Sequence, residues 1–147
     1  MENVTSSRKQ SDVLIFCGVL LFLLALMVGL LIPILTNPRM GLSAHLGGVV
    51  NGIFLIVLGL IWGRLDLSAK WLKTSYYLFL YGTFANFIAV LIGAITGAGK
   101  LMPIAGGKEG PLMIENIITF LLVTLSIAMI FAGILVMSGL YNRFKKL

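Results

Sequence analysis

The sequence predicts an all-α integral membrane protein, a four-helix bundle, from its hydrophobicity and the length of its apolar runs. Of its 147 residues, 59% are hydrophobic and only 11% are charged. A soluble domain of this size cannot bury so much apolar surface, so the composition indicates a lipid environment. Four runs match the roughly 20 residues that a helix needs to cross a bilayer. We predict spans at about 13–35, 42–62, 72–95 and 113–138.

The segments between these spans are short, so residues 1–147 are expected to form one membrane domain. The net charge is +6, and its placement follows the positive-inside rule rather than a nucleic-acid patch. We therefore expect a multi-pass protein of the cell inner membrane with both termini in the cytoplasm, the bilayer as a partner and no nucleic acid. Eight basic residues lie on the predicted cytoplasmic side and three lie opposite: Arg8, Lys9, Arg64, Lys70, Lys73, Arg143, Lys145 and Lys146, against Arg39, Lys100 and Lys108.

The polar segment Met1–Asp12 is predicted to be disordered or to lie at the membrane surface. Arg8 and Lys9 resemble the start of a signal peptide, but the following apolar run is too long and no small-residue cleavage site follows it. The single cysteine, Cys17, excludes an internal disulfide. A lone thiol in an apolar run is more often a small buried hydrophobe than a ligand.

The second run, from Gly41 to Trp62, contains the only histidine of the chain, His45. Steps of three, four and seven residues return to nearly the same side of a helix. One helix face would then carry an imidazole beside a strip almost free of side chains, and that face suits a neighbouring helix or a flat cofactor with a central metal. The residues on this line are Gly41, His45, Gly48, Gly52, Gly59 and Gly63.

Polar side chains inside apolar spans are functional candidates because they are expensive to insert. A second helix starting near Leu42 places His45 only about 5 Å below the outer interface. Asn51 and Asn86 would lie at nearly equal depths of about 14 Å. Glu115 opens the fourth span, where it could instead only stabilise the helix N-terminus. The pattern, with Asn116 and Thr119 near Glu115, suggests a pocket reached from the outer leaflet or from lipid. The glycine-containing outer loop between the last two spans would act as a lid.

The residue types restrict which metal the chain could hold. Zinc needs three or four nitrogen or sulfur ligands, whereas this chain has one histidine and one remote cysteine. Haem needs only one protein ligand because the porphyrin supplies four. His45 is therefore the candidate metal ligand, with Gly48 and Gly52 as candidate cofactor contacts. The alternative is purely structural: His45 bonds a carbonyl, the asparagines join helices and the glycines allow close packing.

Two short motifs resemble a known family. The segment AHLGGVVNG (Ala44–Gly52) is similar to the second helix of small four-span membrane isomerases, and Ala85–Asn86 in YGTFANF is similar to their third helix. That family includes styrene oxide isomerase and hydroxylaminobenzene mutase. The resemblance implies a homotrimer that binds haem b, with His45 on the iron. It also implies that ferric haem acts as a Lewis acid, that Asn51 holds the substrate and that Asn86 makes a second contact.

One departure favours the mutase branch. Styrene oxide isomerase has a tyrosine one turn after the third-helix asparagine, where this chain has Val90. Tyr81 does not replace it, because it lies about 140° around the helix from Asn86. We expect conversion of hydroxylaminobenzene, a small aromatic substrate, to 2-aminophenol without net redox change, with Glu115 as the candidate proton acceptor. The alternatives are an epoxide-to-carbonyl isomerase, a non-catalytic membrane assembly protein, and a haem electron carrier, which would normally need a second axial ligand.

Overall fold

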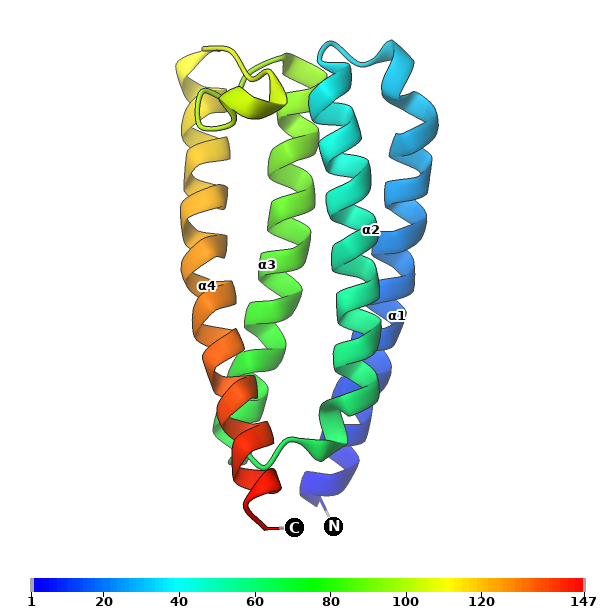
Figure 1. Cartoon of the computed structure of the whole chain (residues 1–147), viewed down its shortest axis with the longest axis vertical. Coiled ribbons are helices and arrows are strands. Elements are labelled where there is room, and N and C mark those ends of the chain that lie inside the picture. The colour runs from blue at the N-terminus through cyan, green and yellow to red at the C-terminus, as the bar shows by residue number, and fades with distance from the viewer. Residues whose placement is uncertain (1, 147) are drawn as a thin grey trace.

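A computed structural model describes the backbone of residues 2–146 and the side chains of residues 7–146. This part of the chain forms four long antiparallel helices with both termini at one end (Figure 1). All four are long and apolar enough to cross a membrane, which confirms the predicted all-α class. The helices are α1 (Glu2–Leu31), α2 (Pro38–Ile61), α3 (Ala69–Thr96) and α4 (Leu112–Phe144), with short 3₁₀ turns η1 (Ile32–Ile34), η2 (Trp62–Arg64) and η3 (Pro103–Ala105) between them.

The turn between α1 and α2 is shorter than predicted. Helix α1 gives way to η1 around Pro33, which lacks the N–H that would continue an α-helix. Helix α2 begins at Pro38, where the missing N–H would be unpaired in any case. The side chain of Asn37 caps it by accepting a 3.1 Å hydrogen bond from the backbone N–H of Met40. With α2 starting at Pro38, His45 lies about 10 Å along the helix, not the predicted 5 Å.

The prediction that Met1–Asp12 is disordered is wrong for its described part, because α1 already begins at Glu2; its position at the membrane surface stays a prediction. Met1 itself lies outside the described residues. Two hydrogen bonds hold the first turns of α1 against α2: Ser11 Oγ donates to the carbonyl of Gly59 at 2.7 Å, and Trp62 Nε1 donates to Gln10 Oε1 at 3.1 Å. Trp62 is fully buried, so it belongs to the core rather than to the membrane interface.

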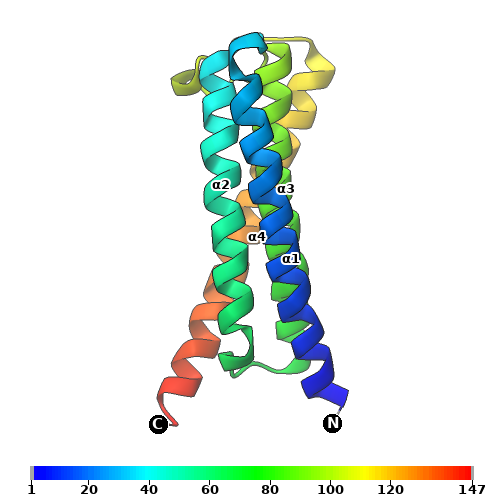
Figure 2. The ribbon, with the colours of Figure 1, turned by 90° about the vertical axis from the view of Figure 1, so that its right-hand side faces the viewer.

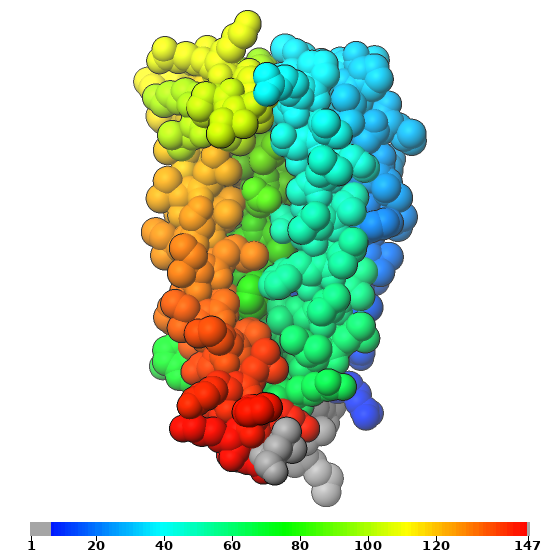
Figure 3. Space-filling view, viewed as in Figure 1, coloured from blue at the N-terminus to red at the C-terminus, as the bar shows by residue number. Residues whose placement is uncertain are grey.

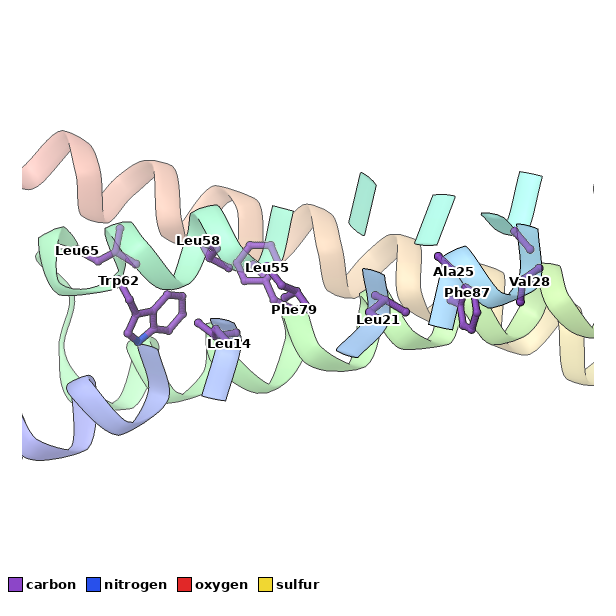
Figure 4. Packing of buried hydrophobic residues seen from close by; sticks show 12 residues of the cluster. Leu14, Leu21, Ala25, Val28, Leu55, Leu58, Trp62, Leu65, Phe79 and Phe87 are labelled. Carbon is purple, nitrogen blue, oxygen red and sulfur yellow. The ribbon is translucent and has the colours of Figure 1, made fainter. Parts of the chain in front are cut away.

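The bundle is open on one side. Helix α2 packs against α1 and α3, and α4 packs along α3. No described Cα atom of α4 comes within 8 Å of α1 or α2. Figure 1 shows the helices side by side in the order α4, α3, α2 and α1, and in the view turned by 90° α1 lies in front and α4 behind (Figure 2). In the space-filling view, α3 remains visible between α4 and α2 (Figure 3). Figure 4 shows the apolar core, which includes Leu14, Leu21, Leu55, Phe79 and Phe87.

The glycine strip of α2 brings α1 and α2 into close contact. A Cβ at Gly52 would lie 2.8 Å from the carbonyl oxygen of Gly18 and 2.9 Å from the backbone nitrogen of Phe22. A Cβ at Gly48 would lie 2.7 Å from the Cβ of Ala25 and 2.8 Å from a ring carbon of Phe87. The face predicted to be bare is thus covered by other parts of the same chain. This packing does not support Gly48 and Gly52 as the floor of a porphyrin site.

The outer loop between α3 and α4 is organised by Glu115, whose side chain is only 2% exposed. Its carboxylate accepts hydrogen bonds from the backbone N–H groups of Gly99 at 2.8 Å, Gly110 at 3.0 Å and Lys100 at 3.2 Å. Three donors on one carboxylate restrain the loop strongly, because hydrogen bonds to a charged acceptor are stronger than hydrogen bonds to a neutral one. The start of α2 holds the same loop through the side chains of Asn37 and Arg39, which donate to the carbonyls of Gly106 and Ile104.

Replacing Gly52 tests the α1–α2 contact. Gly52→Ala is expected to lower the free energy of unfolding by about 1–3 kcal/mol, because the new Cβ meets backbone atoms that cannot rotate away. Gly133→Ala is the matched control, since its Cβ would meet no atom within 4 Å and alanine favours a helix. Thermal unfolding in detergent, followed by circular dichroism, measures the difference. Equal stability losses in the two variants would contradict the close contact.

Candidate functional site

The structure brings Asn51 and Asn86 to the same stretch of the α2–α3 interface. The side-chain Nδ2 of Asn51 donates to the backbone carbonyl of Thr83 at 3.4 Å. One turn earlier on α2, a Cβ at Gly47 would lie 3.7 Å from Nδ2 of Asn86. Both asparagines are half-buried. Asn51 is level with Thr83 and Asn86 is level with Gly47, so the two amides lie about one helical turn apart rather than at nearly equal depth.

Asn86 lies beside the open side of the bundle. One turn earlier, Gly82 contacts Met129 of α4, and the residue after Asn86, Phe87, contacts Gly48 of α2. Asn86 thus lies on the strip of α3 between its contacts with the two flanking helices. Its side-chain amide makes no hydrogen bond within residues 7–146. It can consequently offer both donors and an acceptor to a ligand in the groove between α2 and α4.

An apolar pocket continues this groove toward the end that holds the termini. Its volume is about 300 Å³, and the α2 side begins at Phe54, one turn after Asn51. The rings of Phe54 and Phe79 pack with centroids 5.3 Å apart at 60°. Small-ligand sites usually combine such apolar walls with a few polar groups that orient the ligand. The remaining walls come from Val57, Leu58, Ile61, Gly133, Val136, Met137 and Leu140.

His45 contacts α1 rather than the groove. Its Nδ1 lies 2.8 Å from the carbonyl oxygen of Ala25, and Gly29 leaves room for the ring, since a Cβ there would lie 2.7 Å from Nδ1. A carbonyl only accepts hydrogen bonds, so we assign the proton to Nδ1. Nε2 then keeps its lone pair. Metal-binding histidines commonly have this arrangement, in which one ring nitrogen is held by a carbonyl and the other binds the metal.

The imidazole and the amides of one chain lie on different sides of α2. His45 contacts α1, whereas Asn51 contacts α3. Six residues on a helix of 3.6 residues per turn separate them by about 120°. The single constellation predicted from the sequence is therefore divided into two surfaces. One surface carries the imidazole, and the other carries the two amides and the apolar pocket.

The donor set restricts what metal group the described chain can hold. Within the described residues, no three side chains of histidine, cysteine, aspartate or glutamate come together as metal ligands. A single imidazole with a free Nε2 suits a group such as haem, which brings four equatorial ligands of its own. His45 would be the residue that holds such a group, whereas its glycine neighbours serve helix packing.

Glu115 lies apart from the amides. It is in the first turn of α4, whereas Asn86 lies about 15 Å of helix from the end of α3 at Thr96. Its carboxylate is engaged by the outer loop rather than directed to the groove. That loop-holding role was not predicted. Its role as a proton acceptor stays a prediction that no contact here tests.

Sequence reasoning missed three groups that contact the candidate site residues: the carbonyl of Ala25 and Gly29 beside His45, and Gly47 beside Asn86. Ala25 and Gly29 are four residues apart in the first apolar run, a spacing of small residues that marks close helix contacts. Gly47 directly precedes Gly48 but lies off the helix face that the glycine spacing defines, so the spacing did not indicate it. Tyr81 behaves as predicted: it bonds Thr124 of α4, with the two oxygens 2.5 Å apart.

Comparisons with known proteins identify the family of this chain. The family model described as styrene oxide isomerase matches residues 10–141. Hydroxylaminobenzene mutase HabB of Ectopseudomonas oleovorans is 46% identical over 125 residues, covering 84% of this chain and 76% of the relative. Hydroxylaminobenzene mutase HabA of the same organism is 46% identical over 126 residues, covering 84% of this chain and 93% of the relative.

No solved structure matches the chain. The relatives and the matched family are isomerases, which favours catalysis over the alternatives of an assembly protein and an electron carrier. The matched segment contains the imidazole of α2 and both amides of the α2–α3 interface. The chain belongs to the styrene oxide isomerase family, and it is an isomerase.

Proposed function

We propose that this isomerase is a haem-dependent mutase that converts hydroxylaminobenzene to 2-aminophenol without net redox change. The observation that carries the proposal is the 46% identity to two hydroxylaminobenzene mutases over 84% of the chain. The arrangement of the groove adds support. An aromatic ring suits the apolar pocket, and a hydroxylamine suits the adjacent amides.

The groove accounts for substrate selection. The ring would pack against Phe54 and Phe79, which form the apolar end of the pocket. The N–OH group would then reach the side-chain amide of Asn86, which has no partner within residues 7–146. Asn51 is already anchored to the carbonyl of Thr83 and would hold the substrate in one orientation. Because the groove opens sideways between α2 and α4, a small aromatic molecule could arrive through lipid.

The haem proposal rests on His45. Its Nε2 would hold the iron of haem b, with the ring kept in the required tautomer by the carbonyl of Ala25. Ferric haem, when bound, supplies a Lewis acid that polarises the N–O bond. The apolar walls of the groove would keep bulk water from the activated ring. The reaction moves the hydroxyl group from nitrogen to the ortho carbon. That carbon loses a proton and the nitrogen gains one, so reactant and product are isomers.

The proposed homotrimer is supported by the division of the site. A chain that presents its imidazole on the α1 side and its amides on the α3 side can combine them only with a neighbouring chain. We therefore place each active site between two chains, with His45 from one and Asn86 from the next. The termini would lie in the cytoplasm of an inner-membrane protein, since eight of the eleven basic residues lie at that end.

A second candidate is an epoxide-to-carbonyl isomerase, because the matched family model carries the name styrene oxide isomerase. It would use the same groove and the same Lewis acid. Val90, one turn after Asn86, offers no hydroxyl to an epoxide oxygen. Parallel assays of the purified full chain with hydroxylaminobenzene and styrene oxide separate the two candidates. Faster turnover of styrene oxide would reverse our preference.

Asn86→Ala tests the groove. We expect 2-aminophenol formation from hydroxylaminobenzene to fall by about tenfold to a hundredfold, because an orienting hydrogen bond is lost. The matched control is Asn116→Ala, an exposed asparagine of α4, which should keep the wild-type rate. The rate of product formation by detergent-purified protein is the measurement. Full turnover in Asn86→Ala would exclude its role in the site.

His45→Ala tests the cofactor. The purified wild-type protein is expected to show a Soret absorbance band, and His45→Ala is expected to lose it because His45 is the only histidine of the chain. Cys17→Ala is the control, since it removes the other soft ligand while keeping His45. A visible absorption spectrum is the readout, and it does not depend on turnover. A full Soret band in His45→Ala would rule out ligation by this residue.

Co-expression of His45→Ala with Asn86→Ala tests the division of the site between chains. Each variant alone is expected to keep at most about a tenth of the wild-type rate. If neighbouring chains share each site, random mixing should restore about a quarter of the wild-type rate, since a quarter of the sites receive both intact residues. If one chain supplied the whole site, every chain would carry a defect and mixing would restore nothing.

A further inference from the structure

A large cavity lies at the end of the described chain that holds the termini, away from the groove of the proposed active site. It has a volume of about 620 Å³ and lies between the start of α1, the turn after α2 and the start of α3. This size falls within the range of about 300–1,000 Å³ that small-ligand sites usually have. Its apolar walls are Leu60, Leu65, Leu67 and Leu72.

Two basic side chains, Arg8 and Lys73, line the same cavity. Both are exposed, and neither forms an ion pair within residues 7–146, where the structure shows a salt bridge between Lys146 and Asp66. The cavity therefore combines two unpaired cations with leucine walls. A ligand that satisfies both features carries a negative charge and an apolar part.

The polar wall of the cavity is held in place by contacts with α2. Ser11 donates to the carbonyl of Gly59, and Gln10 accepts from the indole of Trp62, which is fully buried. These bonds fix the first turns of α1, which carry Arg8. The cavity is consequently a built feature of the fold rather than a gap beside a loose terminus.

We propose that this cavity binds an anionic phospholipid, with Arg8 and Lys73 holding the headgroup phosphate. Leu60, which is 67% exposed and lies within the apolar span of α2, would contact an acyl chain. The cavity lies where the basic ends of the helices meet the membrane surface, and basic residues there attract anionic lipids. A soluble phosphate would pair with the cations but would leave the leucine walls exposed to water.

Native mass spectrometry of the full chain in neutral detergent tests the site, with phosphatidylglycerol as the probe and phosphatidylcholine as the zwitterionic comparison. The double variant Arg8→Gln/Lys73→Gln is expected to bind phosphatidylglycerol about thirtyfold more weakly, because it loses the attraction of two basic residues to the anionic headgroup. Each single variant should lose about fivefold. The matched control, Arg64→Gln/Lys70→Gln, removes the same charge from the same end but outside the cavity, and it should bind as wild type does.

Two results would overturn the proposal. Equal weakening in both double variants would mean that the whole basic end attracts the lipid without a defined site. Competition by glycerol phosphate as strong as that by phosphatidylglycerol would identify a soluble phosphate as the ligand. Helicity and thermal unfolding in phosphatidylcholine verify that the variants fold. If the double variant does not fold, the single variants still test the site.

Discussion

The close approach of α1 to α2 is the constraint on which the candidate site depends. Gly52 allows the two backbones to meet, and Gly29 leaves space for the ring of His45. Only at this separation does the carbonyl of Ala25 reach Nδ1 at 2.8 Å. The resulting bond selects the tautomer in which Nε2 can bind a metal. Helix packing and ligand chemistry are thus two results of the same contact.

Helices α2 and α4 do not pack closely against each other, and this leaves the bundle open on one side. Because α4 packs along α3 and meets the turn η2 but not α2 itself, the bundle keeps a lateral groove that contains an apolar pocket. Asn86 lies on α3 between the contacts that this helix makes with α4 and α2. A closed bundle would fill this space with side chains and would leave the amides as helix–helix contacts. The outer loop, held by the buried Glu115, joins the start of α4 to the end of α3. The bundle is therefore open between α2 and α4, whereas hydrogen bonds to Glu115 hold its outer loop in place.

Much of the fold could be predicted because hydrophobic length is a strong signal in a bilayer. The third span agrees with α3 to within a few residues. The predicted second span begins too late because α2 starts with Pro38 and Arg39 directly after the Asn37 cap, and a run of apolar residues does not reveal them. The glycines of α2 were correctly identified as a close-contact strip. Their partner could not be identified, since periodicity shows that a face is narrow but not what lies against it.

The sequence by itself determined the four apolar helices, the single imidazole and the position of Asn51 and Asn86 inside apolar spans, because these follow from composition and the lengths of the apolar runs. Only the tertiary structure decided that His45 contacts α1 while the amides contact α3. It also decided that the carboxylate of Glu115 holds the outer loop. These outcomes depend on which helices become neighbours, and that choice is made by packing between segments far apart in the chain.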